Sequence, residues 1–163
     1  MSIKLEDYVD VEAKLLELGC HQAKSLVLLP QNFHSAINVG DFRQMSEAAT
    51  VKKLLRAAGL ELAELVDRAQ RPPNIHNNAA DWVAPILFVS SALWVQNPAV
   101  VSVALSVIAN YLTDSFKGVN GKTIKLDFVV EKTKTRRCTK ISYEGDVSGI
   151  AALEDILRKT IDE

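Results

Sequence analysis

The densest group of side chains that could do chemistry is a run of cations late in the sequence. Its members lie within residues 132–140 and are Lys132, Lys134, Arg136, Arg137 and Lys140. Lys and Arg neutralise phosphates, so this group predicts contacts with a nucleic acid or with an acidic protein partner. No aromatic residue separates the cations, so stacking on unpaired bases is not expected. The alternative is a solvated hairpin whose charges protect the edge of a sheet from wrong pairing.

The two cysteines and three histidines are the other candidates for chemistry. The spacing of His21, His34 and His76 matches no zinc motif. Cys138 lies among cations that would favour its thiolate, whereas a cysteine buried in a strand would be inert. An enzyme with a site assembled from distant residues would use Cys138, His34 and His76. The sequence itself predicts no catalytic residue, no metal site and no cofactor.

Two further patterns match known binding motifs only in part. The sequence KGVNGKT at 117–123 lacks the spacing of a phosphate-binding Walker loop and is predicted to be a connector. Residues 46–58 and 61–70 are predicted as two helices joined at Gly59, which is the arrangement of a helix-turn-helix. The second of these helices carries three carboxylates and one arginine, so it would repel the phosphates of DNA.

The overall composition is that of an ordinary globular protein. The chain has 163 residues, of which 48% are hydrophobic and 24% are charged, and these values predict one domain over residues 1–163. The net charge of −1 gives no general attraction to nucleic acids or anionic membranes. Residues 1–10 are mixed and acidic, unlike a signal peptide, so we expect a cytoplasmic protein with reduced thiols.

Residues 82–113 contain no charged side chain, and this stretch must lie at the centre of the structure. Pro85 and Pro98 interrupt it, which favours a protein core over a membrane hairpin. A surface covered by a partner is the remaining alternative. Asn97 and Pro98 predict the start of a helix over 98–116. Residues 86–94 fit either a buried strand or a short helix, because the pattern is too short to decide.

Hydrophobic periodicity predicts the other elements. They are helices at 10–18, 46–58 and 61–70, strands at 24–29, 122–131 and 138–143, and a last helix capped by Asp146 or Ser148. The strands at 122–131 and 138–143 are expected to form an antiparallel hairpin. The fold class predicted is α/β or α+β, a single small domain with helices packed on a mixed sheet that includes this hairpin.

Residues 103–161 carry an apolar helix, then IKLDFVV, a basic linker, KISYEG and DVSGIAALEDILRKTI. This order, with its Gly145-Asp146 turn, resembles the end of the small effector-associated accessory components of bacterial conflict and immune systems. The resemblance implies a noncatalytic accessory protein that works beside a separate effector, and it supplies no catalytic residue. The function expected first is therefore binding to another protein or to a second copy of the chain. Nucleic-acid binding through residues 132–140, or an unrecognised enzyme site, are the alternatives, and no membrane association is expected.

Overall fold

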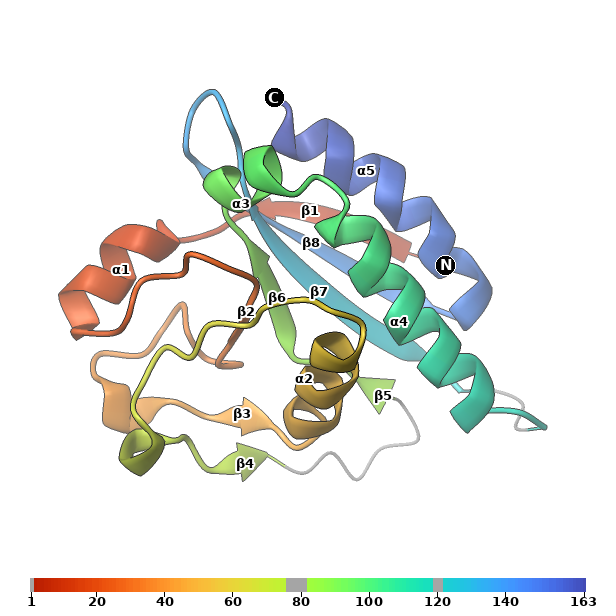
Figure 1. The fold of residues 1–163 in the computed structure, drawn as a ribbon, viewed down its shortest axis with the longest axis horizontal. Helices are drawn as coiled ribbons and strands as arrows, with labels where there is room; N and C mark the ends of the chain where they lie inside the picture. The colour runs from red at the N-terminus through yellow and green to blue at the C-terminus, as the bar shows by residue number, and fades with distance from the viewer. Residues whose placement is uncertain (1, 76–81, 119–121) are drawn as a thin grey trace.

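A mixed β-sheet organises the chain (Figure 1). The computed structural model describes residues 2–75, 82–118 and 122–163. The strand order is β1 (Ser2–Asp7), β8 (Cys138–Gly145), β7 (Ile124–Glu131), β6 (Ile86–Val89) and β2 (Val27–Leu29). Strands β6 and β7 are parallel, and the other neighbours in this order are antiparallel. The short β5 (Trp82–Val83) also pairs with β7, beside the first residues of that strand.

The central strand β7 forms as its alternating sequence predicts. Leu126 and Phe128 are fully buried on the helix-covered face of the sheet, whereas Val129 is buried on the opposite face. Alternation of side chains across the two faces follows from the pleat of a strand. The predicted antiparallel hairpin with β8 is confirmed over the whole length of both strands. The chain therefore has an α+β fold, in which five helices pack with the mixed sheet.

Helices cover the two faces of the sheet unequally. One face carries α2 (Ala48–Ala57), α4 (Val100–Ser115) and α5 (Ala151–Ile161), with a large core beneath them. Figure 1 shows α4 and α5 side by side over β7 and β8. The other face carries α1 (Val11–Leu18) and the irregular segment that follows β2. The predicted ends of α1 are confirmed, because the Asp10 carboxylate accepts from the Ala13 N–H and Gly19 ends the helix with φ of 72°.

The charge-free stretch forms the centre of the core. It provides β5 and β6, then α3 (Ser91–Gln96), then α4, so residues 86–94 are a strand followed by a helix. Helix α4 begins at Val100, two residues after the predicted start at Pro98; Ala99 is at its N-cap position, and no side chain caps it. Its polar residues Ser106 and Asn110 face solvent, while Ile108 is buried. Over the ranges that the structure describes, no helix is long and apolar enough to cross a membrane.

The helix predicted over residues 61–70 is wrong. This segment runs past Leu26, the residue just before β2: Leu62 bridges Leu26 in parallel, and the Ala63 N–H donates to the Leu26 carbonyl at 2.9 Å. Only the short 3₁₀ turn Arg68–Gln70 is helical. The apolar side chains of residues 61–66 are divided between the two cores, with Leu62 on one and Ala63, Leu65 and Val66 on the other. The backbone bonds with Leu26 and His21, which lie before β2, in place of helical bonds, and the helix-turn-helix arrangement is thereby excluded.

A second, two-stranded sheet was also absent from the prediction. Strands β3 (Gln44–Met45) and β4 (Asn74–Ile75) are parallel and pair residue for residue. They lie in segments whose sequence shows no strand pattern, and β4 follows the two prolines of the predicted loop at 71–81. Residues 76–81 of that loop, with His76, and residues 119–121 of the predicted connector lie outside the described residues.

Candidate functional site

A cavity of about 540 Å³ opens between α2, the segment 63–66 and the segment 71–74. Helix α2 turns its apolar residues Ala48, Val51 and Leu55 toward the core. Its polar side therefore lines the cavity, and the lining includes Lys52, Lys53 and Arg56. Arg71 adds a fourth cation from the opposite side. Because Glu64 is the one carboxylate among the lining residues described, the cavity has an excess of three positive charges.

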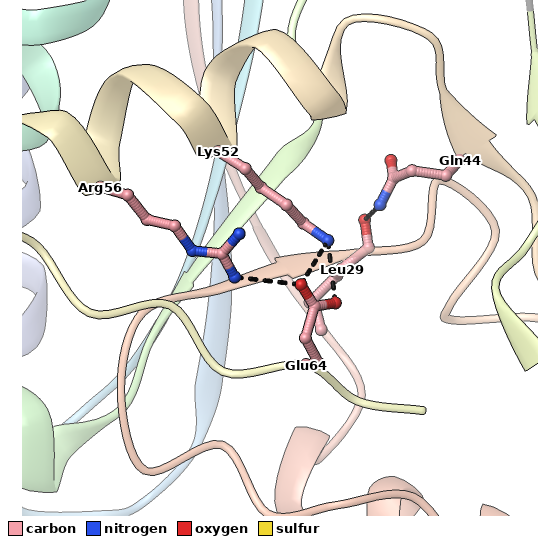
Figure 2. Close-up of polar contacts among 5 residues, drawn as sticks. All are labelled: Leu29, Gln44, Lys52, Arg56 and Glu64. Atoms are coloured by element: carbon pink, nitrogen blue, oxygen red, sulfur yellow. Dashed lines mark hydrogen bonds and ion pairs between the residues drawn. The ribbon is translucent and has the colours of Figure 1, made fainter. Parts of the chain in front are cut away.

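Glu64 holds two of these cations at the mouth of the cavity. Figure 2 shows Lys52 and Arg56 reaching from α2 toward the Glu64 carboxylate. The Lys52 ammonium lies 2.9 Å from Glu64 Oε2, and the Arg56 guanidinium lies 3.1 Å from Oε1. Burial alone would raise the pKa of Glu64, but hydrogen bonds and charge from Lys52 and Arg56 outweigh it and lower the pKa. The three side chains form a fixed array that leaves cationic surface unneutralised.

The small sheet of β3 and β4 holds in place the wall of the cavity that carries Arg71. The Gln44 side-chain amide donates to the Leu29 carbonyl at 3.1 Å and its oxygen accepts from the Met45 N–H at 2.8 Å. The Gln44 N–H donates to the Pro73 carbonyl at 3.1 Å, which ties β3 to the segment that carries Arg71. Gln44 is buried, so these bonds satisfy a side chain that would otherwise destabilise the fold. They fix the position of one wall relative to the main sheet.

The lowered pKa of Glu64 predicts a pH dependence of stability. Above its ordinary pKa of 4.5, Glu64 is charged in both states and its ion pairs stabilise the folded one. As the pH falls through the lower pKa of the folded state, that contribution is lost. The Glu64→Gln variant should be less stable than the parent at about pH 7, and the difference should shrink toward about pH 3. Urea unfolding at both pH values measures this, and a difference that stays constant would contradict it.

The basic group predicted at residues 132–140 is spread around the β7–β8 turn. The Lys132 ammonium lies 2.9 Å from the Glu163 carboxylate, and Lys140 lies 3.6 Å from Glu6. The turn also docks on the end of α5, where the Thr133 N–H donates to the Ile161 carbonyl at 2.8 Å. The three cations that remain exposed on the turn are Lys134, Arg136 and Arg137. Nucleic-acid or acidic-partner binding by this group stays a prediction.

The cysteines and histidines that the structure describes, Cys20, Cys138, His21 and His34, do not converge on one site. Cys138 is 3% exposed, and burial raises the pKa of its thiol to about 12, with nearby carboxylates acting in the same direction. The cations of the sequence neighbourhood therefore do not activate it. His21 pairs with Asp67 at 2.9 Å, and His34 is exposed near Tyr8. The described part of the chain contains no group of three or more metal-ligating residues.

The burial of the two thiols predicts how they react with a thiol reagent. Cys20 is half-buried, and burial raises the pKa of its thiol as well. In the native protein at about pH 8, Cys20 should react slowly and Cys138 should react only when the chain unfolds. Intact-mass measurement after timed labelling with iodoacetamide, with and without urea, separates the two. Equal reaction rates of both thiols in the native protein would contradict this expectation.

A buried polar pair lies where the parallel strands β6 and β7 end. The Glu131 carboxylate, 1% exposed, accepts from the Ser91 N–H at 3.0 Å and from the Ser91 hydroxyl at 2.5 Å. The carboxyl ends of parallel strands often carry ligand sites. Here the carboxylate holds the first residue of α3, while the Ser90 hydroxyl accepts from the Leu93 N–H. Both contacts satisfy the free N–H groups at the start of α3.

The cavity was not predicted from the sequence, although part of its signal was present. Lys52, Lys53 and Arg56 are a cationic group at helical spacing, on a helix that the sequence predicts. The missing information was spatial, because no local pattern shows that the segment carrying Glu64 lies beside these cations. Comparison of the chain with protein-family models, with curated proteins and with solved structures finds no match.

Proposed function

We propose that this chain is a cytoplasmic, noncatalytic binding protein in the accessory role that the resemblance of residues 103–161 implies. Its ligand is a small organic anion that carries phosphate or carboxylate groups and binds in the cavity beside α2. The observation that carries this proposal is the excess of three positive charges around about 540 Å³ of open space. Cavities of roughly 300–1,000 Å³ are the usual size for small-molecule sites.

The arrangement of the cations supports an anionic ligand. Lys52 and Arg56 are held in place by Glu64 and lose little conformational freedom when a ligand binds. Lys53 and Arg71 are exposed and form no ion pair within the described residues, so their charges are available to a ligand. An Arg guanidinium can bind a phosphate or carboxylate through two parallel hydrogen bonds. The ligand's anionic groups would therefore lie between α2 and the segment that carries Arg71.

The rest of the lining supports a ligand with a partly apolar body. Leu28, Pro30 and Phe42 contribute to the cavity, together with Ala48 and Leu65. These side chains are buried in the folded chain. A few polar groups that fix orientation, combined with apolar surface that supplies contact area, are typical of small-molecule sites. Bulk inorganic salt would use the charges but not this apolar surface.

Calorimetric titration with inorganic pyrophosphate and with citrate tests the proposal. The double variant Lys53→Gln, Arg71→Gln should bind at least one of these anions about tenfold more weakly than the parent, because two charges are lost while the Glu64 ion pairs remain. The matched control is Lys159→Gln, which removes an exposed cation on α5, outside the cavity lining. The proposal fails if the parent binds neither anion, or if Lys159→Gln weakens binding as much as the double variant.

A further inference from the structure

Strand β1 leaves one edge of the main sheet open. It stands at one end of the strand order, and no other described strand pairs with its outer side. Most of its side chains are exposed, and Leu5 is 50% exposed. The opposite edge of the sheet, at β2, is partly covered, because the Ala63 N–H donates to the carbonyl of Leu26, the residue just before that strand. A sheet edge with free N–H and C=O groups readily pairs with another chain.

The pairing of β1 with β8 shows which of its amide groups point outward. The Tyr8 N–H, just after β1, donates to the Cys138 carbonyl at 3.0 Å, and the same register continues along both strands. In an antiparallel pair, every second residue bonds to the neighbouring strand. The even-numbered residues of β1 therefore bond to β8. The N–H and C=O groups of Ile3, Leu5 and Asp7 point away from the sheet.

We propose that β1 pairs antiparallel with β1 of a second copy of this chain, on a twofold axis at Leu5. Only outward-pointing groups can bond, so odd-numbered residues must lie opposite odd-numbered residues. Around the middle of the strand, this condition allows twofold axes at Lys4, Leu5 or Glu6. An axis at Lys4 or at Glu6 places two like charges directly opposite each other, which destabilises a strand pair.

The axis at Leu5 makes the charges complementary. Lys4 of each copy then lies opposite Glu6 of the other copy, at positions where the side chains of two strands are closest. Glu6 already lies 3.6 Å from Lys140 of β8, on the face of the sheet away from α5. The dimer thus extends this ion pair into a row in which Lys140, Glu6 and the second copy's Lys4 alternate in sign.

The same axis also covers exposed apolar surface. Leu5 and Ile3 are paired in register with Ile141 and Tyr143 of β8, whose side chains belong to the core beneath α5. Leu5 lies at the margin of that core and remains half exposed. In the dimer, the two Leu5 side chains lie directly opposite each other and continue the core across the axis. Each copy contributes the same surface, as a twofold dimer requires.

Light scattering and sedimentation over a concentration series up to about 1 mM test the proposal. The parent protein should reach twice the 17.9 kDa mass of one chain. The variants Lys4→Glu and Glu6→Lys should each dissociate about tenfold more readily, since each puts like charges opposite each other twice. A mixture of the two variants should form a heterodimer, because every facing pair is again of opposite sign.

A third variant, Leu5→Lys, places two cations together on the axis and should also prevent dimerisation. Circular dichroism and thermal unfolding establish that each variant is folded, which is expected because these side chains are exposed. A parent protein that stays monomeric throughout the series overturns the proposal. A dimer that persists in all three variants overturns it as well, since the interface would then lie elsewhere.

Discussion

Replacing Leu126 by alanine should lower the free energy of unfolding by about 2–5 kcal/mol, the largest loss that we expect from a single aliphatic substitution here. Leu126 lies on the central strand β7, is fully buried and belongs to the core beneath α4 and α5. Truncation to alanine removes apolar contacts and leaves a cavity that the neighbouring strands, β8 on one side and β5 and β6 on the other, cannot close without breaking their register. The midpoint and slope of urea unfolding measure the loss.

The same substitution at Leu16 is the matched control for Leu126→Ala. Leu16 lies on α1 and is 82% exposed, so its truncation removes little buried surface. Alanine also favours the helix, and the stability should change by less than about 0.5 kcal/mol. If the two variants lost similar stability, β7 would not be at the centre of a well-packed core.

Replacing Glu131 by alanine should cost about 2–4 kcal/mol. The substitution leaves the N–H and the hydroxyl of Ser91 without their acceptor, in a site where both residues are almost fully buried. Removal of a buried charge offsets part of this cost, because Glu131 no longer needs to be desolvated on folding. Helix α3 should lose order at its first turn, which hydrogen exchange of the Ser91 amide detects.

A double-mutant cycle with Ser91→Ala separates the interaction free energy of the Glu131–Ser91 pair from the effect of removing each side chain alone. Because both variants remove the same hydrogen bond, the double variant should lose less stability than the sum of the single variants, by about 0.5–3 kcal/mol. Additive losses would show that the two side chains act independently. A pair of distant buried residues, such as Leu126 and Leu15, should by contrast give additive effects.

The elements with a strong local signal were predictable from the sequence. The alternation of β7, the Asp10 cap and the Gly19 end of α1 are each set by residues within one element. The helix prediction for residues 61–70 failed because their apolar spacing fits a helix, while in the fold their backbone bonds with Leu26, just before β2. Strand β1 alternates polar and apolar residues, but only Ile3 and Leu5 carry the apolar face, and such a short run gives a weak strand signal. Most of its side chains are exposed, which follows from its place at the edge of the sheet.

The candidate site was less predictable than the fold. Its walls come from α2, the segment 63–66 and the segment 71–74, and their meeting depends on two pairings that no local pattern shows. The exposed cations of the turn at 132–137 were visible in the sequence. The ion pair of Lys132 with Glu163 and the docking of Thr133 on the end of α5 were not, because both depend on the packing of the last helix. A group of charges in the sequence thus identifies candidates, and the fold decides which remain available.

The pairing of β1 with β8 also governs the order in which the chain can fold. Residues that face each other in these strands are more than 130 positions apart, so during synthesis β1 emerges from the ribosome long before its only described neighbour. Closing so large a loop costs entropy that nearby contacts do not repay, and β1 should join the sheet late. Until then the first strand is an unpaired, partly apolar segment, and this interval is when a nascent chain would need protection from aggregation.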